Sequence, residues 1–157
     1  MTSSPPPDAP RTRAQRRRDT EHRLNHDVDL WVASASADGT PYLVPLSFDW
    51  DGEALWVATP AASPTGRNLA ATRTVRLGLG QTRDVVMIDG EVEVLDIDAL
   101  PQEQGDRFAA RTGFDPRTLT GYRWFRISPR RIQAWREVNE LPERELIDRK
   151  SVCRERV

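Results

Sequence analysis

Hydroxyl, glycine and arginine residues gather in one short segment between two apolar stretches, "ATPAASPTGRNLAATR". Backbone N–H groups at the start of a helical turn, together with nearby hydroxyls, suit an anion and most often a phosphate. A guanidinium adds a charge-assisted hydrogen bond. The segment therefore predicts a phosphate-binding turn made by six residues: Thr59, Ser63, Thr65, Gly66, Arg67 and Asn68. The alternative is a plain strand-to-helix connection in which Ser63 or Thr65 caps the helix.

Other side chains that could do chemistry are sparse. His22 and His26 lie four residues apart, which would place both on one face of a helix. No cysteine or third histidine accompanies them, so we expect a solvated helix surface and no metal site. The sequence contains no evident nucleophile–base pair or carboxylate pair. Such a chain is typical of cofactor chemistry, in which the protein supplies position, electrostatics and exclusion of water.

Composition limits the classes of function. The 157 residues carry 23 basic and 24 acidic side chains and a net charge of −1, and this balance argues against nucleic-acid binding on electrostatic grounds. Cys153 is the only cysteine, which excludes an internal disulfide. No apolar run approaches the ~20 residues of a membrane span, and the first residues lack the apolar core of a signal peptide. We expect a cytoplasmic protein.

Three parts of the chain differ in character. Residues 1–12, rich in proline, serine and threonine, are predicted to be a disordered tail. Residues 13–138 form the predicted domain, beginning with a helix over 13–26 whose arginine run we interpret as a solvated face or, less favoured, as a docking site for an acidic partner. Residues 139–157 are a charged tail that Leu141, Leu146 and Ile147 could dock in part.

The domain itself alternates apolar and polar residues in the manner of strands. Turns at Asp38-Gly39 and Asp51-Gly52 predict an antiparallel meander from residue 28 to 59. Further strands are expected over 74–80 and 84–96, with a bulge or bend at Asp89-Gly90. Residues 122–138 are expected to form one or two more strands. A helix is expected over 98–113, capped by Asp98 and ended by Gly113. Six or so strands with short turns and few helices predict a closed antiparallel barrel.

Four segments follow one another in a recognisable order: "LWVASASADGTPYLVPLSFDW", "GRNLAATRTVRLGL", "VVMIDGEVEVL" and "YRWFRISPRRIQAW". This pattern resembles the pyridoxamine 5′-phosphate oxidase-like family over Val28 to Trp135. The resemblance implies a mainly β protein, a six-stranded antiparallel split β-barrel with a few short helices. It also implies a homodimer that binds FMN or the deazaflavin F-420 at the dimer interface and transfers a hydride to or from a small conjugated substrate.

The resemblance also implies roles for particular residues. Ser63 matches the serine of the family's phosphate-binding loop, whereas Pro64 and Thr65 stand where the family has arginine and lysine. Trp135 matches an aromatic residue that packs near the flavin. Ile147 replaces a histidine of true pyridoxamine phosphate oxidases, which argues against that substrate.

The remaining implied contacts lie on strands. Pro45 and Ser47 occupy the second strand, where family members touch the flavin ring through backbone groups. Val85 stands where the family often has a glutamine. For Trp31, Trp50 and Trp56 we favour a role in packing. Two functions remain: a flavin-type oxidoreductase, or a non-catalytic split-barrel module that binds a cofactor, haem or a small ligand.

Overall fold

The computed structural model describes residues 8–149, so most of the predicted N-terminal tail and Cys153 lie outside the described part. The helices are α1 (Arg13–His26), α2 (Pro64–Thr72) and α3 (Gln102–Thr112), with two 3-10 turns, η1 (Pro116–Thr118) and η2 (Val138–Glu143). The strands are β1 (Asp29–Ala35), β2 (Pro41–Ser47), β3 (Asp49–Trp50), β4 (Leu55–Pro60), β5 (Thr74–Gln81), β6 (Asp84–Asp96), β7 (Tyr122–Trp135) and β8 (Glu145–Asp148).

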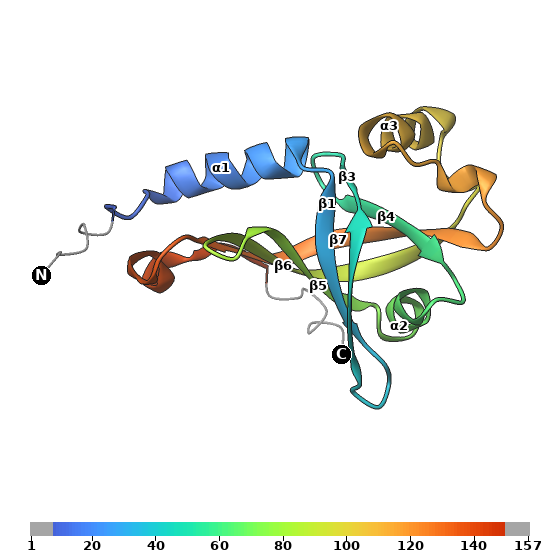
Figure 1. Cartoon of the computed structure of the whole chain (residues 1–157), viewed down its shortest axis with the longest axis horizontal. Helices are drawn as coiled ribbons and strands as arrows, with labels where there is room; N and C mark the ends of the chain where they lie inside the picture. Colours follow the sequence, from blue (N-terminus) through green and yellow to red (C-terminus); the bar gives the residue numbers. More distant parts are fainter. Residues whose placement is uncertain (1–7, 150–157) are drawn as a thin grey trace, which may run out of the picture.

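All of these strands belong to one antiparallel sheet in the order β2-β1-β5-β6-β7-β4-β3, with β8 added to β7. Only Phe48 separates β2 from β3, so the chain itself joins the two ends of this order and the sheet curls into a half-barrel (Figure 1). The prediction of a mainly β split barrel is confirmed. The six expected strands become eight because the second divides at Phe48 and because β8 forms in the charged tail.

Register places an apolar row on the inner face and a mixed row on the outer face. The inner row runs across six strands and consists of Val44, Val32, Leu77, Ile88, Ile132 and Ile147. Four of these six residues are buried in the main core, with Val44 and Ile147 packed against it. The neighbouring row, one residue along each strand, faces outward and consists of Pro45, Trp31, Gly78 and Met87, followed by Gln133.

The expected irregularity at Asp89-Gly90 is confirmed, and its cause lies on the opposite strand. Asp89 faces Arg131 and Gly90 faces Pro129, so Arg130 is the extra, bulged residue of β7. A side chain on Gly90 would meet the Ile127 Cγ2 atom at 2.6 Å, and glycine therefore permits the close approach of the two strands at this bend.

The basic N-terminal helix is held by its arginines more than by apolar packing. α1 begins with a capping box between Thr12 and Gln15. Arg16 is 1% exposed and donates to the backbone carbonyl of Glu143, while Arg13 donates to the Leu146 carbonyl at 2.9 Å. The interpretation of the arginine run as a solvated face is therefore wrong for the buried Arg16. Arg13 is exposed, and its hydrogen bond together with that of Arg16 joins α1 to the chain around η2 and β8.

Two smaller expectations have different outcomes. α3 begins after Pro101 with no side-chain cap, so the expected cap at Asp98 is wrong, whereas Gly113 ends the helix in the left-handed conformation as predicted. Leu146 is buried, which confirms that part of the charged tail docks. Within residues 8–149, no helix is long and apolar enough to cross a membrane.

Candidate functional site

The turn between β4 and α2 brings together the six residues first predicted to hold a phosphate. Ser63 is the N-cap of α2, and its hydroxyl accepts from the Gly66 N–H at 3.0 Å and donates to the Pro60 carbonyl at 2.8 Å. The Thr59 hydroxyl lies 3.2 Å from the Ser63 hydroxyl oxygen. Capping therefore already engages the hydroxyl groups of Thr59 and Ser63.

Three further residues of this turn point into the protein. Thr65 and Gly66 are buried, and the buried Asn68 amide donates to the Ser34 hydroxyl at 3.1 Å. A side chain on Gly66 would meet the Pro60 carbonyl oxygen at 2.2 Å, so this glycine is required for helix–strand packing. Arg67 is the exposed member, and one of its terminal nitrogens donates to the Ala62 carbonyl.

Pro45, Ser47 and Trp135 lie elsewhere, on the outer face of the sheet. Pro45 faces Trp31, and the Ser47 hydroxyl donates to the Asp29 carboxylate at 2.6 Å. Trp135 ends β7 and faces Val85. The residues predicted for one cofactor site therefore form two sets in the protomer. One set lies in the β4–α2 turn, and the other consists of Pro45, Ser47 and Trp135 on the outer face of the sheet.

An apolar pocket of about 520 Å³ occupies this outer face, and we call it the outer pocket. Its main side chains are Trp31, Leu43, Val85, Met87 and Trp135, over the backbone of Gly78. Trp31 is 50% exposed and Leu43 is 59% exposed. The expectation that Trp31 serves in packing is therefore wrong within the protomer.

The sequence held a signal for the residues that were missed. Leu30 and Val32 are buried in β1, so Trp31 between them must face outward. The register then places Gly78 and Met87 beside it. Strand alternation combined with pairing could have identified this row, whereas residue type alone could not.

Charged groups hold the edge of the outer pocket in place. Arg76 lines the pocket and pairs with Asp89 at 3.2 Å. The Arg144 guanidinium lies 5.9 Å from the Trp135 ring. Next to Trp135, the Arg136 N–H donates to Glu140 at 3.0 Å. The pKa of the buried Glu140 carboxyl is lowered to about 2, mainly by the hydrogen bond from the Arg11 side chain and also by the backbone N–H groups of Arg11 and Arg136. Burial acts in the opposite direction and raises this pKa.

Thr59 and Trp135, one residue from each set, lie toward opposite ends of β7. Thr59 faces Arg123 at the start of this strand, and Trp135 is its last residue. Twelve residues of extended chain span roughly 40 Å. This separation applies to Thr59 and Trp135, whereas Asn68 of the same turn bonds to Ser34 of β1, next to Ala33 in the lining of the outer pocket.

The sequence profile of a family described as pyridoxamine 5′-phosphate oxidase matches residues 22–136, more than half of the chain. The chain belongs to the pyridoxamine 5′-phosphate oxidase-like split-barrel family. A comparison with curated proteins gives no significant match.

Several solved structures share the fold of this split-barrel protein. An F420 reductase is 20% identical with a TM-score of 0.59, covering 71% of this chain and 94% of the other. An FAD-binding protein from Mesorhizobium loti is 21% identical with a TM-score of 0.60, covering 74% and 89%. HutZ, the haem storage protein from Vibrio cholerae, is 18% identical with a TM-score of 0.58, covering 73% and 89%. At these identities the likeness shows the fold alone.

The residues of this family member fit the two parts of a flavin-type cofactor unequally. The outer pocket offers aromatic and aliphatic surface of the kind that accepts a planar ring. The β4–α2 turn offers a helix N-terminus and the exposed Arg67. Among the described residues, no group of three or more histidine, cysteine, aspartate or glutamate side chains gathers to hold a metal.

Proposed function

We propose that this chain is a flavin-type oxidoreductase that binds FMN or F-420 and acts on a small conjugated substrate. The observation that carries the proposal is the outer pocket, an apolar hollow on the sheet surface whose lining includes two tryptophans, Trp31 and Trp135. Its volume lies within the range of small-molecule sites.

The chain's own residues bind and orient in this proposal. Trp31, Met87 and Trp135 pack against the cofactor ring and exclude water from it. Arg67 and the N-terminus of α2 hold the phosphate tail. When bound, the cofactor supplies the ring that accepts or donates the hydride, so no acidic or basic side chain is required for that step.

A homodimer completes the proposed site. The outer pocket of one copy holds the ring, and the β4–α2 turn of the second copy holds the phosphate. Support comes from the opposite positions of Thr59 and Trp135 relative to β7 and from the large exposed fractions of Trp31 and Leu43, which are typical of a surface that another molecule covers.

Fluorescence titration with FMN and with F-420 tests cofactor binding. We expect Trp135→Ala to weaken binding by about tenfold or more because it removes ring packing. Tyr42→Ala is its matched control, since Tyr42 is an exposed aromatic residue on the same strand as Leu43 and does not line the pocket.

We expect Arg67→Ala to cost about 1.5–3 kcal/mol of binding free energy in the same titration, because it removes a charge-assisted hydrogen bond to the phosphate. Arg73→Gln, at the other end of α2, is the control and should cost little.

Mixing two variants tests whether the site is shared. Trp135→Ala and Arg67→Ala protomers are each defective in one half of the site. If the site is shared between copies, a mixed dimer regains one native site, so the mixture binds cofactor with native affinity at reduced stoichiometry. No recovery in a mixture that forms mixed dimers would contradict the shared site. Binding of neither FMN nor F-420 by the native chain would contradict the proposed function.

The alternative is a module that binds a ligand without turnover. The hydroxyl groups of Thr59 and Ser63 are already engaged in the β4–α2 turn, which favours a ligand without a phosphate tail. Met87 lines the outer pocket and carries a thioether that can serve as a haem ligand. A Soret band that shifts in Met87→Ala would support this alternative over the oxidoreductase.

A further inference from the structure

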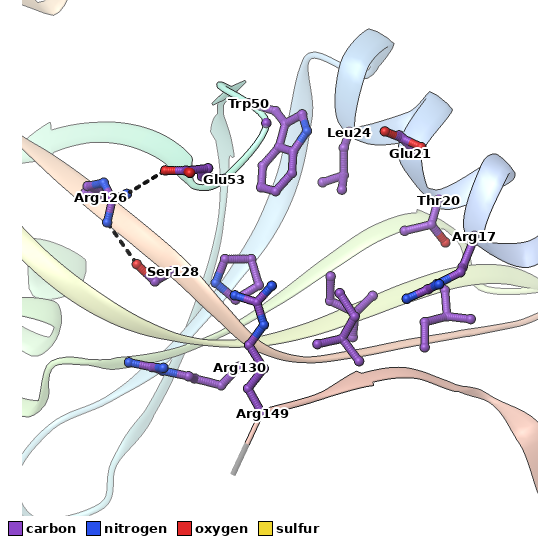
Figure 2. Close-up of a pocket in the computed structure, with 15 residues that line it drawn as sticks. Arg17, Thr20, Glu21, Leu24, Trp50, Glu53, Arg126, Ser128, Arg130 and Arg149 are labelled. Atoms are coloured by element: carbon purple, nitrogen blue, oxygen red, sulfur yellow. Dashed lines mark hydrogen bonds and ion pairs between the residues drawn. The ribbon is translucent and has the colours of Figure 1, made fainter. Parts of the chain in front are cut away.

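A second cavity lies on a different part of the molecule, between α1, the β3–β4 turn, β7 and β8 (Figure 2). Its volume is about 590 Å³. It shares no lining residue with the outer pocket. Because four arginines stand around it, we call it the arginine-lined cavity: Arg17, Arg126, Arg130 and Arg149.

The floor of the arginine-lined cavity is apolar. Leu24 comes from α1, Trp50 from β3, and Ile132 from β7, while Leu146 and Ile147 come from β8. Trp50 is half-buried and presents its ring to the cavity from above, opposite the strands (Figure 2). Such a floor favours the apolar body of a ligand.

Two of the arginines around this floor are already paired. Arg130 pairs with Glu91, which lies outside the cavity. Arg126 donates to the Ser128 hydroxyl at 3.0 Å and lies 3.9 Å from Glu53, whose side chain is 86% exposed. Their charges are therefore partly neutralised before any ligand arrives.

The other two arginines differ. Neither Arg17 nor Arg149 makes a side-chain ion pair or hydrogen bond with any residue of the described range 8–149. Figure 2 shows Arg17 directed from α1 toward the cavity and Arg149 rising beside it from the end of β8. The lining contains four arginines and two glutamates, Glu21 and Glu53, so its formal charge is 4 − 2 = +2.

The backbone of β7 and β8 fixes the positions of Arg130 and Arg149 around the apolar floor. Arg130 is the bulged residue of β7, and its carbonyl accepts from the Arg149 N–H at 2.6 Å. A bulge redirects a side chain without breaking the sheet. This hydrogen bond holds the end of β8, and with it Arg149, beside the bulged residue Arg130 in the lining of the cavity.

We propose that the arginine-lined cavity is a second binding site, for an organic anion with an aromatic or aliphatic body. The body lies on Leu24, Trp50 and Leu146, and its carboxylate or similar anionic group meets the guanidinium groups of Arg17 and Arg149. Guanidinium groups bind such anions through paired, charge-assisted hydrogen bonds. The proposal does not rest on the proposed oxidoreductase function, because the two pockets have no residue in common.

Calorimetric titration of the full chain with 1-naphthoate tests the site. We expect binding to the native protein, and a loss of roughly tenfold in affinity in each of Arg17→Gln and Arg149→Gln. Arg18→Gln is the matched control, because Arg18 follows Arg17 on the same helix, is exposed and does not line the cavity. We expect this control to bind like the native chain.

Two further ligands separate the roles of charge and apolar body. Neutral 1-naphthamide should bind more weakly than 1-naphthoate, and inorganic phosphate, which lacks an apolar body, should not compete with it. Equal affinity of native, Arg17→Gln and Arg149→Gln proteins for 1-naphthoate would overturn the proposal, because it would place the ligand elsewhere, for example in the outer pocket. Absence of 1-naphthoate binding to the native chain would also overturn it.

Discussion

The β4–α2 turn and the outer pocket contrast in how their side chains are used. In the turn, Thr59, Ser63 and Asn68 bond to other groups of the protein, and Gly66 has no room for a side chain. In the outer pocket, Trp31 and Leu43 are largely exposed. Residue types that favour an anion site also favour helix capping, so type and spacing alone cannot distinguish the two. Exposure of apolar strand residues is a more direct sign of a surface that binds something.

The largest expected effect compares one glycine from each region. Gly66→Ala places a methyl group 2.2 Å from the Pro60 carbonyl oxygen in a buried site, so we expect the free energy of unfolding to fall by about 2–4 kcal/mol. Gly78→Ala meets nothing nearer than 3.6 Å, and we expect its stability to stay the same or rise by up to about 1 kcal/mol. Urea denaturation followed by circular dichroism measures both. Equal stability of the two variants would show that the turn has room to adjust.

The second prediction concerns Glu140, which holds the end of β7 next to Trp135. Folding lowers its pKa from 4.5 to about 2, so its contribution to stability is complete above pH 4.5 and is lost as the pH falls toward 2. We expect Glu140→Gln to lose about 2 kcal/mol of unfolding free energy at pH 7, and this difference from the native chain to vanish near pH 2.

Hydrogen exchange separates the two regions in the same variant. The Arg136 amide, which donates to Glu140, should exchange faster in Glu140→Gln at pH 7. The Gly66 amide, which donates to Ser63, should keep its native protection once global unfolding is allowed for. Equal acceleration at both amides would mean that the turn and the end of β7 unfold as one unit.

Most of the fold could be predicted because strand alternation and Asp-Gly turns are local signals. The alternation in β1 and the glycines at Gly39 and Gly52, both with positive φ, identify the first strands. β8 could not be predicted, because its pairing with β7 depends on distant residues such as Ile132 facing Ile147. The division at Phe48 was missed for the same reason, since β2 and β3 differ only in which strand each one pairs with.

The candidate site was less predictable than the fold. The family resemblance led to Trp135, which does line the outer pocket. It did not lead to Met87 or Trp31, because which residues share a row depends on the register across β1, β5 and β6. The arginine-lined cavity was not predicted at all, since Arg17 and Arg149 are far apart in the sequence.

The third prediction tests the capping role of Ser63. Removal of its hydroxyl in Ser63→Ala leaves the Gly66 N–H without its acceptor, and we expect a loss of about 1 kcal/mol of unfolding free energy. Ser47→Ala is the control from the outer face, where the lost partner is the exposed Asp29, and we expect a loss below about 0.5 kcal/mol. Thermal or urea unfolding of both variants checks this difference, and a smaller loss in Ser63→Ala than in Ser47→Ala would contradict it.

The smallest expected effect on stability belongs to Leu43, although the change should matter for binding. Leu43→Gln alters a side chain that is 59% exposed on β2, so we expect the free energy of unfolding of the protomer to change by less than about 0.5 kcal/mol. The same substitution places an amide in the apolar lining of the outer pocket, where a ring or a second copy would have to desolvate it. Cofactor titration and sedimentation at matched protein concentrations should therefore show weaker binding or weaker association, with urea denaturation nearly unchanged.

If both binding and association stay native, the exposed apolar face has no partner at Leu43. The contrast between the outer pocket and the buried turn would then reflect only how each is packed.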